Sequence, residues 1–156
     1  MSASVKSSLD KPKPLRSLEQ AVFLNIQKVA DVLMSEVAQA LRPVELSPTQ
    51  YNVLRILRAA GPEGLPCGRI GEKMLTREPD MTRLLDRLEK RKLIERWRDT
   101  ADRRVVRGRI APDGLKVLAG LDEKILALHR DQLGHLGNPK LRQLADLLEN
   151  VRSRTS

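Results

Sequence analysis

The spacing of the apolar residues constrains the fold of this 156-residue chain more than any other feature. Over most of the sequence, aliphatic side chains recur at steps of three and four positions, which is the period of one face of an α-helix. The period changes to short β-branched stretches only within residues 93–110. One Phe, one Tyr and one Trp leave the core to aliphatic side chains. The pattern predicts a mainly α-helical domain with a small β-hairpin.

The first half of the chain contains two helix-start patterns. A helix is predicted over residues 17–42, where apolar side chains share one face. A second is predicted over residues 47–60, because Ser47, Pro48 and Gln50 occupy the N-cap, first and third positions that helices favour. Both predicted helices therefore have a local reason to begin where they do.

Two shorter helices and a hairpin are predicted next. The helices cover residues 66–75 and 78–91, and the tight turn between them gives the pair the shape of a helix-turn-helix. The hairpin is formed by residues 93–98 and 105–110 around a polar turn at residues 99–104. Helix-turn-helix units bind nucleic acid in many proteins, so the net charge of this region indicates whether it can do the same.

The chain ends in two long amphipathic helices, predicted over residues 112–136 and 138–152. Residues 1–16 combine Ser, Lys and Pro with few apolar side chains, so a flexible basic tail is expected there, and residues 153–156 form a second tail. The length suits a single domain over residues 17–152.

Positive charge is concentrated in one part of the sequence. The formal net charge is +9 and the pI is about 10.2. Residues 77–109 contain twelve Lys or Arg and seven Asp or Glu, which accounts for five of these nine charges. Such clustering is typical of a nucleic-acid footprint. A membrane surface is the alternative polyanion, but no apolar run approaches the ~20 residues that span a bilayer.

The predicted helix over residues 78–91 has an apolar stripe and a polar outer face. Thr82, Arg83 and Arg87 lie on or beside the outer face and are suited to base edges in a major groove. Asp86 can accept from cytosine or orient a neighbouring Arg. A merely solvated face is the alternative interpretation. The stripe consists of Met81, Leu84, Leu85 and Leu88.

The hairpin carries six arginines, and Arg103 and Arg104 lie at or beside its tip. A weakly hydrated, planar guanidinium suits a narrow minor groove. Asp102 can hold Arg104 extended through a charge-assisted hydrogen bond, although the acids of the turn can also serve only to shape it. Phosphate contacts are predicted for Lys90, Arg77 and the Ser47 end of the second helix.

Two motifs, Thr82-Arg83-Leu84-Leu85-Asp86-Arg87-Leu88 and Asp102-Arg103-Arg104, occur in an order of elements that resembles the MarR family of winged helix-turn-helix transcriptional regulators. The resemblance covers roughly residues 17–152. It implies a homodimer whose first and last helices, residues 17–42 and 112–152, intertwine. It also implies that residues 43–111 form a DNA-binding lobe for a pseudo-palindromic, double-stranded operator.

The resemblance also implies a small-molecule pocket, which makes a repressor released by an effector the expected function. An apolar or phenolic effector is predicted near Phe23, Tyr51, Leu115 and Leu118, because aliphatic side chains dominate this part of the chain. Two alternatives remain open at this point. One is a constitutive DNA-binding protein with a filled core, and the other is a winged-helix module for nonspecific DNA binding or protein interaction.

Two positions depart from the family pattern. Lys92 stands where the family usually has Gly after the recognition helix, so a positive φ there would cost on the order of 1 kcal/mol. Ala111 stands where a capping Thr is common, so the helix that begins at Pro112 has no side-chain cap.

Other chemistry receives little support. No catalytic motif is present, so no enzyme is expected. His129 and His135 have no neighbouring Cys, so neither a metal site nor another cofactor is expected. Cys67 is interpreted as an inert thiol, with redox sensing as the less favoured alternative. The N-terminus lacks an apolar secretory signal, so a cytoplasmic location is expected.

Overall fold

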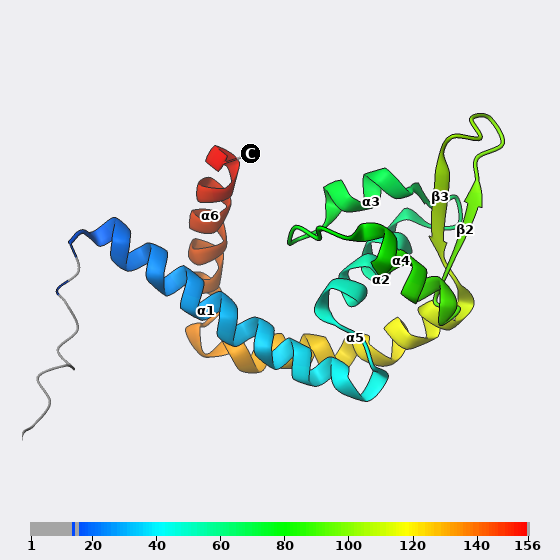
Figure 1. Ribbon diagram of the computed structural model, residues 1–156. Coiled ribbons are helices and arrows are strands. Elements are labelled where there is room, and N and C mark those ends of the chain that lie inside the picture. Colours follow the sequence, from blue (N-terminus) through cyan, green and yellow to red (C-terminus); the bar gives the residue numbers. More distant parts are fainter. Residues whose placement is uncertain (1–13, 15, 156) are drawn as a thin grey trace, which may run out of the picture. The chain divides into compact units, whose positions relative to one another are not determined.

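The computed structural model describes residue 14 and residues 16–155 of the chain (Figure 1). These residues divide into two compact units, one ending at Leu33 and one beginning at Met34, and each is described by itself. The tail predicted over residues 1–16 lies mostly outside the described residues. The helices are α1 (Leu18–Leu41), α2 (Pro48–Ala60), α3 (Cys67–Lys73), α4 (Met81–Lys90), α5 (Pro112–Leu133) and α6 (Asn138–Thr155), and the strands are β1 (Leu65–Pro66), β2 (Ile94–Arg98) and β3 (Val106–Ile110).

The prediction of a mainly α-helical fold with a β-hairpin is confirmed. β2 and β3 pair antiparallel from Ile94 opposite Ile110 to Arg98 opposite Val106. The hairpin, called the wing from here on, projects beyond the helices that surround its base (Figure 1). α3 and α4 form the predicted helix-turn-helix, although α3 is shorter than the 66–75 expected.

A third strand, β1, was not predicted. It completes a sheet with the order β1-β3-β2, in which Leu65 lies opposite Gly108. Two residues, one of them Pro66, are too few to show an alternating pattern. Gly64 makes the approach possible, because its φ is +63° and a Cβ there would lie 2.2 Å from the Gly108 carbonyl oxygen.

Three helix boundaries also differ from the prediction. α4 begins at Met81 because Asp80 is its N-cap and accepts a hydrogen bond from the Arg83 N–H at 3.1 Å. The first three residues of the predicted 78–91 helix therefore precede it. α5 ends at Leu133 and a short 3₁₀ turn follows, whereas the prediction extended to residue 136. α6 continues to Thr155, so most of the tail predicted over 153–156 is helical.

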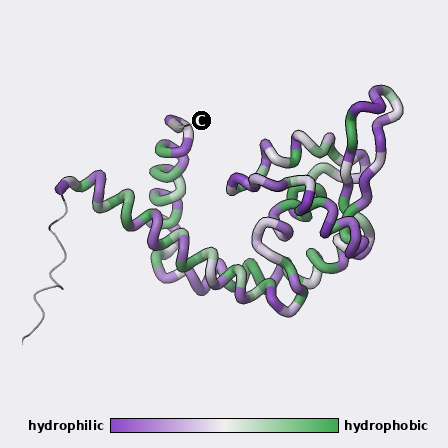
Figure 2. The backbone as a smooth tube through the Cα atoms, in the orientation of Figure 1, coloured by the Kyte–Doolittle hydropathy of each residue, from purple (hydrophilic) through white to green (hydrophobic). Residues whose placement is uncertain are grey.

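The core of the second unit is aliphatic, as the composition predicts, and it lies where the inner faces of α2, α4, α5 and the sheet meet. Figure 2 shows apolar and polar residues alternating along these helices, which is the pattern of one buried face. The side chains with almost no exposed surface are Leu41, Val53, Leu54, Leu57, Ile70, Leu88, Ile94 and Leu118. This packing fixes α4 against the base of the wing.

The predicted start of α2 is confirmed in detail. The Ser47 hydroxyl accepts from the Gln50 N–H at 3.1 Å, and the Gln50 side chain accepts from the Ser47 N–H at 3.0 Å. This reciprocal pair is a capping box, and it satisfies two backbone donors at once. By contrast, Ala111 precedes α5 without a side-chain cap, as the sequence indicates.

Lys92 adopts the left-handed conformation that the family pattern suggests for its position, with φ of 60°. The substitution Lys92→Gly is expected to raise the free energy of unfolding by about 1 kcal/mol, because glycine has no Cβ to clash there. Urea denaturation measures the change. Lys92→Ala is the matched control, since it removes the same charge and keeps a Cβ. An equal gain in both variants would contradict the backbone explanation.

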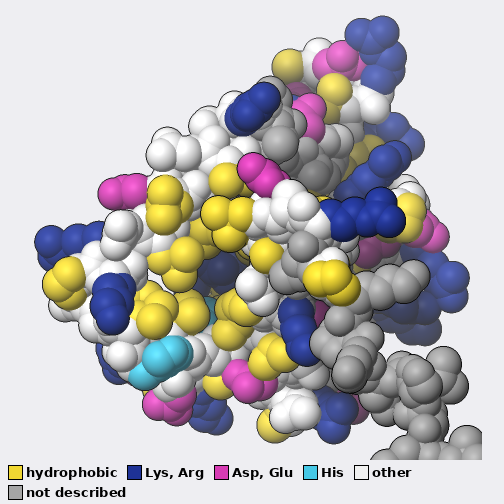
Figure 3. Space-filling view, turned by 90° about the vertical axis from the view of Figure 1, so that its left-hand side faces the viewer, with side chains coloured by type: hydrophobic (Ala, Val, Ile, Leu, Met, Phe, Trp, Pro, Cys, Tyr) yellow, Lys and Arg dark blue, Asp and Glu magenta, His cyan; other side chains and the backbone are white. Residues whose placement is uncertain are grey.

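α6 exposes an apolar stripe to solvent in the single chain. None of its side chains from Asn138 to Arg154 is buried, and Leu144, Leu147, Leu148 and Val151 are all exposed. Exposed hydrophobic side chains also gather between charged ones on the face drawn in Figure 3. α1 shows similar exposure at Val22, Phe23, Ile26 and Val29. None of the described helices has the length and apolar character needed to cross a membrane.

Candidate nucleic-acid interface

The inner face of α4 packs against the core, and its polar outer face is exposed to solvent. Leu84, Leu85 and Leu88 are buried against the core. The exposed residues include Thr82, Arg83, Asp86 and Arg87, which are the four residues predicted to lie near bases, and Lys90. Asp80, as N-cap, also places a carboxylate at the first turn, where the helix dipole favours negative charge.

The basic side chains of residues 77–109 fall into two groups of six. In the first group, each side chain is held by an acid or a carbonyl: Arg91, Arg96, Arg98, Arg104, Arg107 and Arg109. In the second group, the side chains make no hydrogen bond or ion pair with any described residue, and all six are exposed: Arg77, Arg83, Arg87, Lys90, Lys92 and Arg103. Five of the six predicted cationic contacts belong to the second group.

Arg104 is the sixth predicted cation, and its partner is the one expected from the sequence. Its Nε and Nη2 donate to the two carboxylate oxygens of Asp102, both at 3.0 Å. These bonds hold the pKa of Asp102 below its ordinary value. The Arg104 side chain is still 91% exposed, so the carboxylate holds it extended without covering it. The Arg103 backbone is fixed too, because its carbonyl accepts from Arg98 Nη1 at 2.9 Å.

Asp99 and Asp102 also shape the turn of the wing, so both interpretations of these acids hold together. Asp99 Oδ1 accepts from the Ala101 N–H at 2.8 Å, while its other oxygen pairs with Arg107 at 3.4 Å. Arg107 in turn donates to the Glu63 carbonyl at 3.0 Å. The base of the wing is therefore tied to the loop before β1.

Asp86 has a partner that the sequence did not indicate. Its carboxylate pairs with Arg96 of β2, which also pairs with Glu89 of α4 at 3.0 Å. Asp86 therefore orients an arginine of the wing. Neither Glu89 nor Arg96 was predicted to take part in the site. The three-residue spacing of Asp86 and Glu89 on one helix face was the available signal.

The predicted phosphate contacts lie on three different segments. Arg77 lies in the loop between α3 and α4, and Lys90 lies in the last turn of α4. Ser47 is engaged in the capping box, so its hydroxyl is already used. The group that α2 presents to a phosphate at this end is therefore its helix N-terminus. The Ser47 hydroxyl also lies 3.0 Å from the Thr49 hydroxyl.

The comparisons with known proteins cover the same region and extend beyond it. The family model of the MarR family matches residues 46–106, from the residue before the α2 cap into β3. The crystal structure of a MarR transcription factor from Planctomyces limnophilus is 38% identical, with a TM-score of 0.68, over 86% of this chain and 98% of that one. The chain belongs to the MarR family. It is therefore a transcriptional regulator of that family.

One further relative agrees with this assignment, and one solved complex contains a protein of the same fold. The HTH-type transcriptional repressor MdtR of Bacillus subtilis is 30% identical over 69% of this chain and 71% of its own length. The S. aureus MepR–DNA complex contains a protein with the same fold, with a TM-score of 0.76 at 22% identity over 84% of this chain and 96% of that one.

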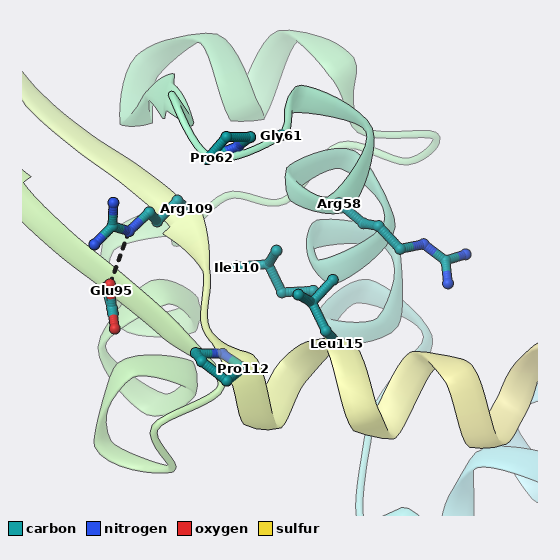
Figure 4. Close-up of a pocket in the computed structure, with 8 residues that line it drawn as sticks. All are labelled: Arg58, Gly61, Pro62, Glu95, Arg109, Ile110, Pro112 and Leu115. Atoms are coloured by element: carbon teal, nitrogen blue, oxygen red, sulfur yellow. Dashed lines mark hydrogen bonds and ion pairs between the residues drawn. The ribbon is translucent and has the colours of Figure 1, made fainter.

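A cavity of 340 Å³ lies in this MarR-family protein between the end of α2, the base of the wing and the start of α5 (Figure 4). Ile110, Pro112 and Leu115 contribute apolar lining. Two arginines also line it, but their guanidinium groups are engaged elsewhere. Arg109 pairs with Glu95 at 2.8 Å, and Arg58 points away from the cavity. The interior is therefore mainly apolar.

Arg58 connects α2 to α5 through a bidentate ion pair with Asp122, with both hydrogen bonds at 2.9 Å. The hydrogen bonds from Arg58 hold the pKa of Asp122 below its ordinary value. The pair lies next to the cavity, because Arg58 is one of the lining residues.

The four residues predicted for an effector pocket have different surroundings. Leu115 lines the cavity, whereas Tyr51 and Leu118 are buried in the core cluster. Phe23 belongs to the other unit and is exposed. The helical period placed Tyr51 and Leu118 on apolar helix faces, but it did not show that both are buried in the core.

The remaining candidate groups have ordinary surroundings. Cys67 is half-buried, and burial raises the pKa of its thiol, which makes the thiolate scarce at neutral pH. Among the residues that the structure describes, no three His, Cys, Asp or Glu side chains gather as metal ligands. His129 Nδ1 instead lies 3.1 Å from the Gln132 side-chain oxygen.

Proposed function

We propose that this protein binds double-stranded DNA sequence-specifically as a homodimer and represses transcription. α4 enters a major groove, where Thr82, Arg83 and Arg87 read base edges, and Arg103 and Arg104 of the wing enter the adjacent minor groove. Half-sites would lie about 10 to 10.5 bp apart, or a near multiple.

The distribution of unpaired cations is the observation that carries this proposal. Arginines that hold the lobe together have acid or carbonyl partners, while Arg83, Arg87 and Arg103 are exposed and have none among the described residues. Unpaired guanidinium groups on a helix-turn-helix face and at a wing tip suit phosphate and base acceptors. MepR, a protein of the same fold, was crystallised in complex with DNA, which supports DNA binding as the function.

The dimer is supported by the apolar stripe of α6. Contiguous exposed hydrophobic surface of this kind marks an interaction site. A second copy of the chain is the natural partner, since two-fold symmetry matches a pseudo-palindromic operator. α1 also exposes apolar residues, which a second copy of the chain would cover as well.

A nonspecific winged-helix module is the alternative, and it would use the same charge without reading sequence. Both functions give steep salt dependence, so the ratio of affinities for cognate and random DNA distinguishes them. The test is fluorescence anisotropy with a fragment from upstream of the gene and a scrambled control at fixed salt. A preference of about a thousandfold supports the proposal. Equal affinity for every fragment of a genome-wide selection would favour the module.

We further propose that a small apolar or phenolic effector occupies the cavity beside Leu115 and releases the DNA. A volume of 340 Å³ is within the range of small-molecule sites. The cavity is lined by residues of both the wing and α5, so a bound effector can change the position of the wing relative to α5. A coupling free energy of about 1–3 kcal/mol would lower operator affinity several-fold to about a hundredfold.

Filling the cavity is expected to abolish the response to such an effector. Leu115→Trp should keep operator affinity but remove the effect of phenol and isopropylbenzene, one phenolic and one purely apolar probe. Leu126→Trp is the matched control, since Leu126 also lies on α5, is equally exposed and does not line the cavity. Anisotropy titrations with and without the probes measure both. An unchanged response in Leu115→Trp would place the effector elsewhere.

A further inference from the structure

One carboxylate of α4 bonds the same wing residue twice. Glu89 Oε2 accepts from the Arg96 backbone N–H at 3.0 Å, and Glu89 Oε1 accepts from Arg96 Nη2 at 3.0 Å. The same Nη2 also pairs with Asp86, one turn earlier on α4. Asp86, Glu89 and Arg96 form a cluster that we call the clamp, and it joins α4 to β2.

The backbone contact has a topological cause. β2 is an outer strand of the sheet β1-β3-β2, so the N–H groups on its open edge have no strand partner. Glu89 supplies the missing acceptor at Arg96. α4 thus occupies the place that a fourth strand would take at this point.

The clamp is also well shielded from water. The Arg96 side chain is only 19% exposed, compared with 91% for Arg104. Its Nε is buried and lacks a hydrogen-bond partner in the described part of the chain. A guanidinium this covered cannot reach a phosphate without leaving its carboxylates, and losing them would leave a desolvated charge. Arg96 is therefore covered and paired with carboxylates, whereas the neighbouring cations such as Arg83 and Arg87 are exposed and have no partner among the described residues.

We propose that Arg96 is a positioning residue that locks the wing to the recognition helix, so that the base-reading residues of α4 and the tip of the wing meet DNA at one fixed spacing. The inference rests on the proposed function. It assigns no DNA contact to Arg96 itself. When α4 and the wing are held rigidly, less conformational entropy is lost on binding. The affinity therefore rises for a DNA site whose major and minor grooves lie at the matching spacing.

The first experiment compares Arg96→Met with Arg98→Met. Both variants remove one positive charge from β2, but the hydrogen bond of Arg98 among the described residues is to the Arg103 carbonyl at the wing tip, so Arg98→Met frees that carbonyl and keeps every bond of the clamp. Loss of the clamp is expected to lower the cognate-to-random affinity ratio by about tenfold relative to Arg98→Met. Affinities for random DNA should be similar in the two variants. Arg96→Lys, which keeps the charge, should recover part of the ratio.

The second experiment needs no DNA. Trp97 is the only tryptophan, and it follows Arg96 on β2, so its ring lies on the opposite face of the strand. Time-resolved fluorescence anisotropy of Trp97 is expected to show an added fast component in Arg96→Met and none in Arg98→Met. Glu89→Gln provides a milder variant with the same expected change, should Arg96→Met not fold by circular dichroism.

The two experiments separate the possible failures. If the wild-type protein shows no preference for any DNA sequence, the proposed function is wrong. The fluorescence anisotropy of Trp97 then tests by itself whether the clamp holds the wing. Anisotropy decays that match between Arg96→Met and Arg98→Met overturn the clamp. Equal affinity ratios in these two variants overturn its role in specificity, even where the wing has loosened.

Discussion

Arg83→Ala is expected to lower operator affinity by about 1–3 kcal/mol while changing affinity for random DNA much less. Arg83 lies on the exposed face of α4, and its guanidinium has no partner among the described residues. A side chain with this freedom can donate twice to a guanine, and such a bond is lost only where that guanine is present. The preference at one base position should therefore relax.

Lys90→Ala is the control for this prediction, because Lys90 is an exposed cation in the last turn of the same helix. It should weaken all sequences alike and reduce the slope of log affinity against log salt by about 1. Anisotropy titrations of both variants at several salt concentrations give the two quantities. Equal losses on operator and random DNA for Arg83→Ala would remove Arg83 from base reading.

The local features of the fold were predictable because each depends on residues close in sequence. The capping box of Ser47 and Gln50 needs only a three-residue spacing, and the Leu84–Leu88 stripe needs only the helical period. The Asp102–Arg104 pair is equally local. Such features can be read from one sequence, since the chain itself brings the groups together.

Two of the features that were missed, β1 and the burial of Tyr51, depend on segments far apart in sequence, whereas the third, the start of α4, is local. β1 exists only because Gly64 lets the chain approach Gly108, and neither residue shows this alone. The start of α4 was wrong by three residues because Pro79 suits a first helical turn as well as a loop, and the Asp80 cap decided between them. Tyr51 was assigned to a pocket although the packed core covers it.

The division of the arginines shows why charge clustering alone gives an incomplete site. Net charge counts Arg96 and Arg83 equally, yet one is covered by two carboxylates and the other is exposed. Only three-dimensional contacts separate cations that hold the lobe together from those left for a polyanion. The sequence therefore predicted a basic interface, and the structure divides its cations into those with acid or carbonyl partners and those that are exposed without one among the described residues.

Leu147→Asp is expected to convert the proposed dimer to a monomer of 17.6 kDa and to lower operator affinity by a larger factor than any single DNA-contact variant. Leu147 is 56% exposed in the single chain, within the apolar stripe of α6. A charge buried there without a partner would cost several kcal/mol, at about the level that disrupts an interface. Sedimentation equilibrium measures the mass.

The loss of DNA binding follows from the loss of the second half-site. Two lobes joined in one dimer bind with an advantage of about 10²–10⁴ over one lobe, because the second contact is intramolecular. Ser153→Asp adds the same charge on the side of α6 opposite Leu144 and should leave both mass and affinity unchanged. A Leu147→Asp protein that remains dimeric would exclude the α6 stripe as the interface. A monomer with full operator affinity would instead show that one lobe recognises the operator alone.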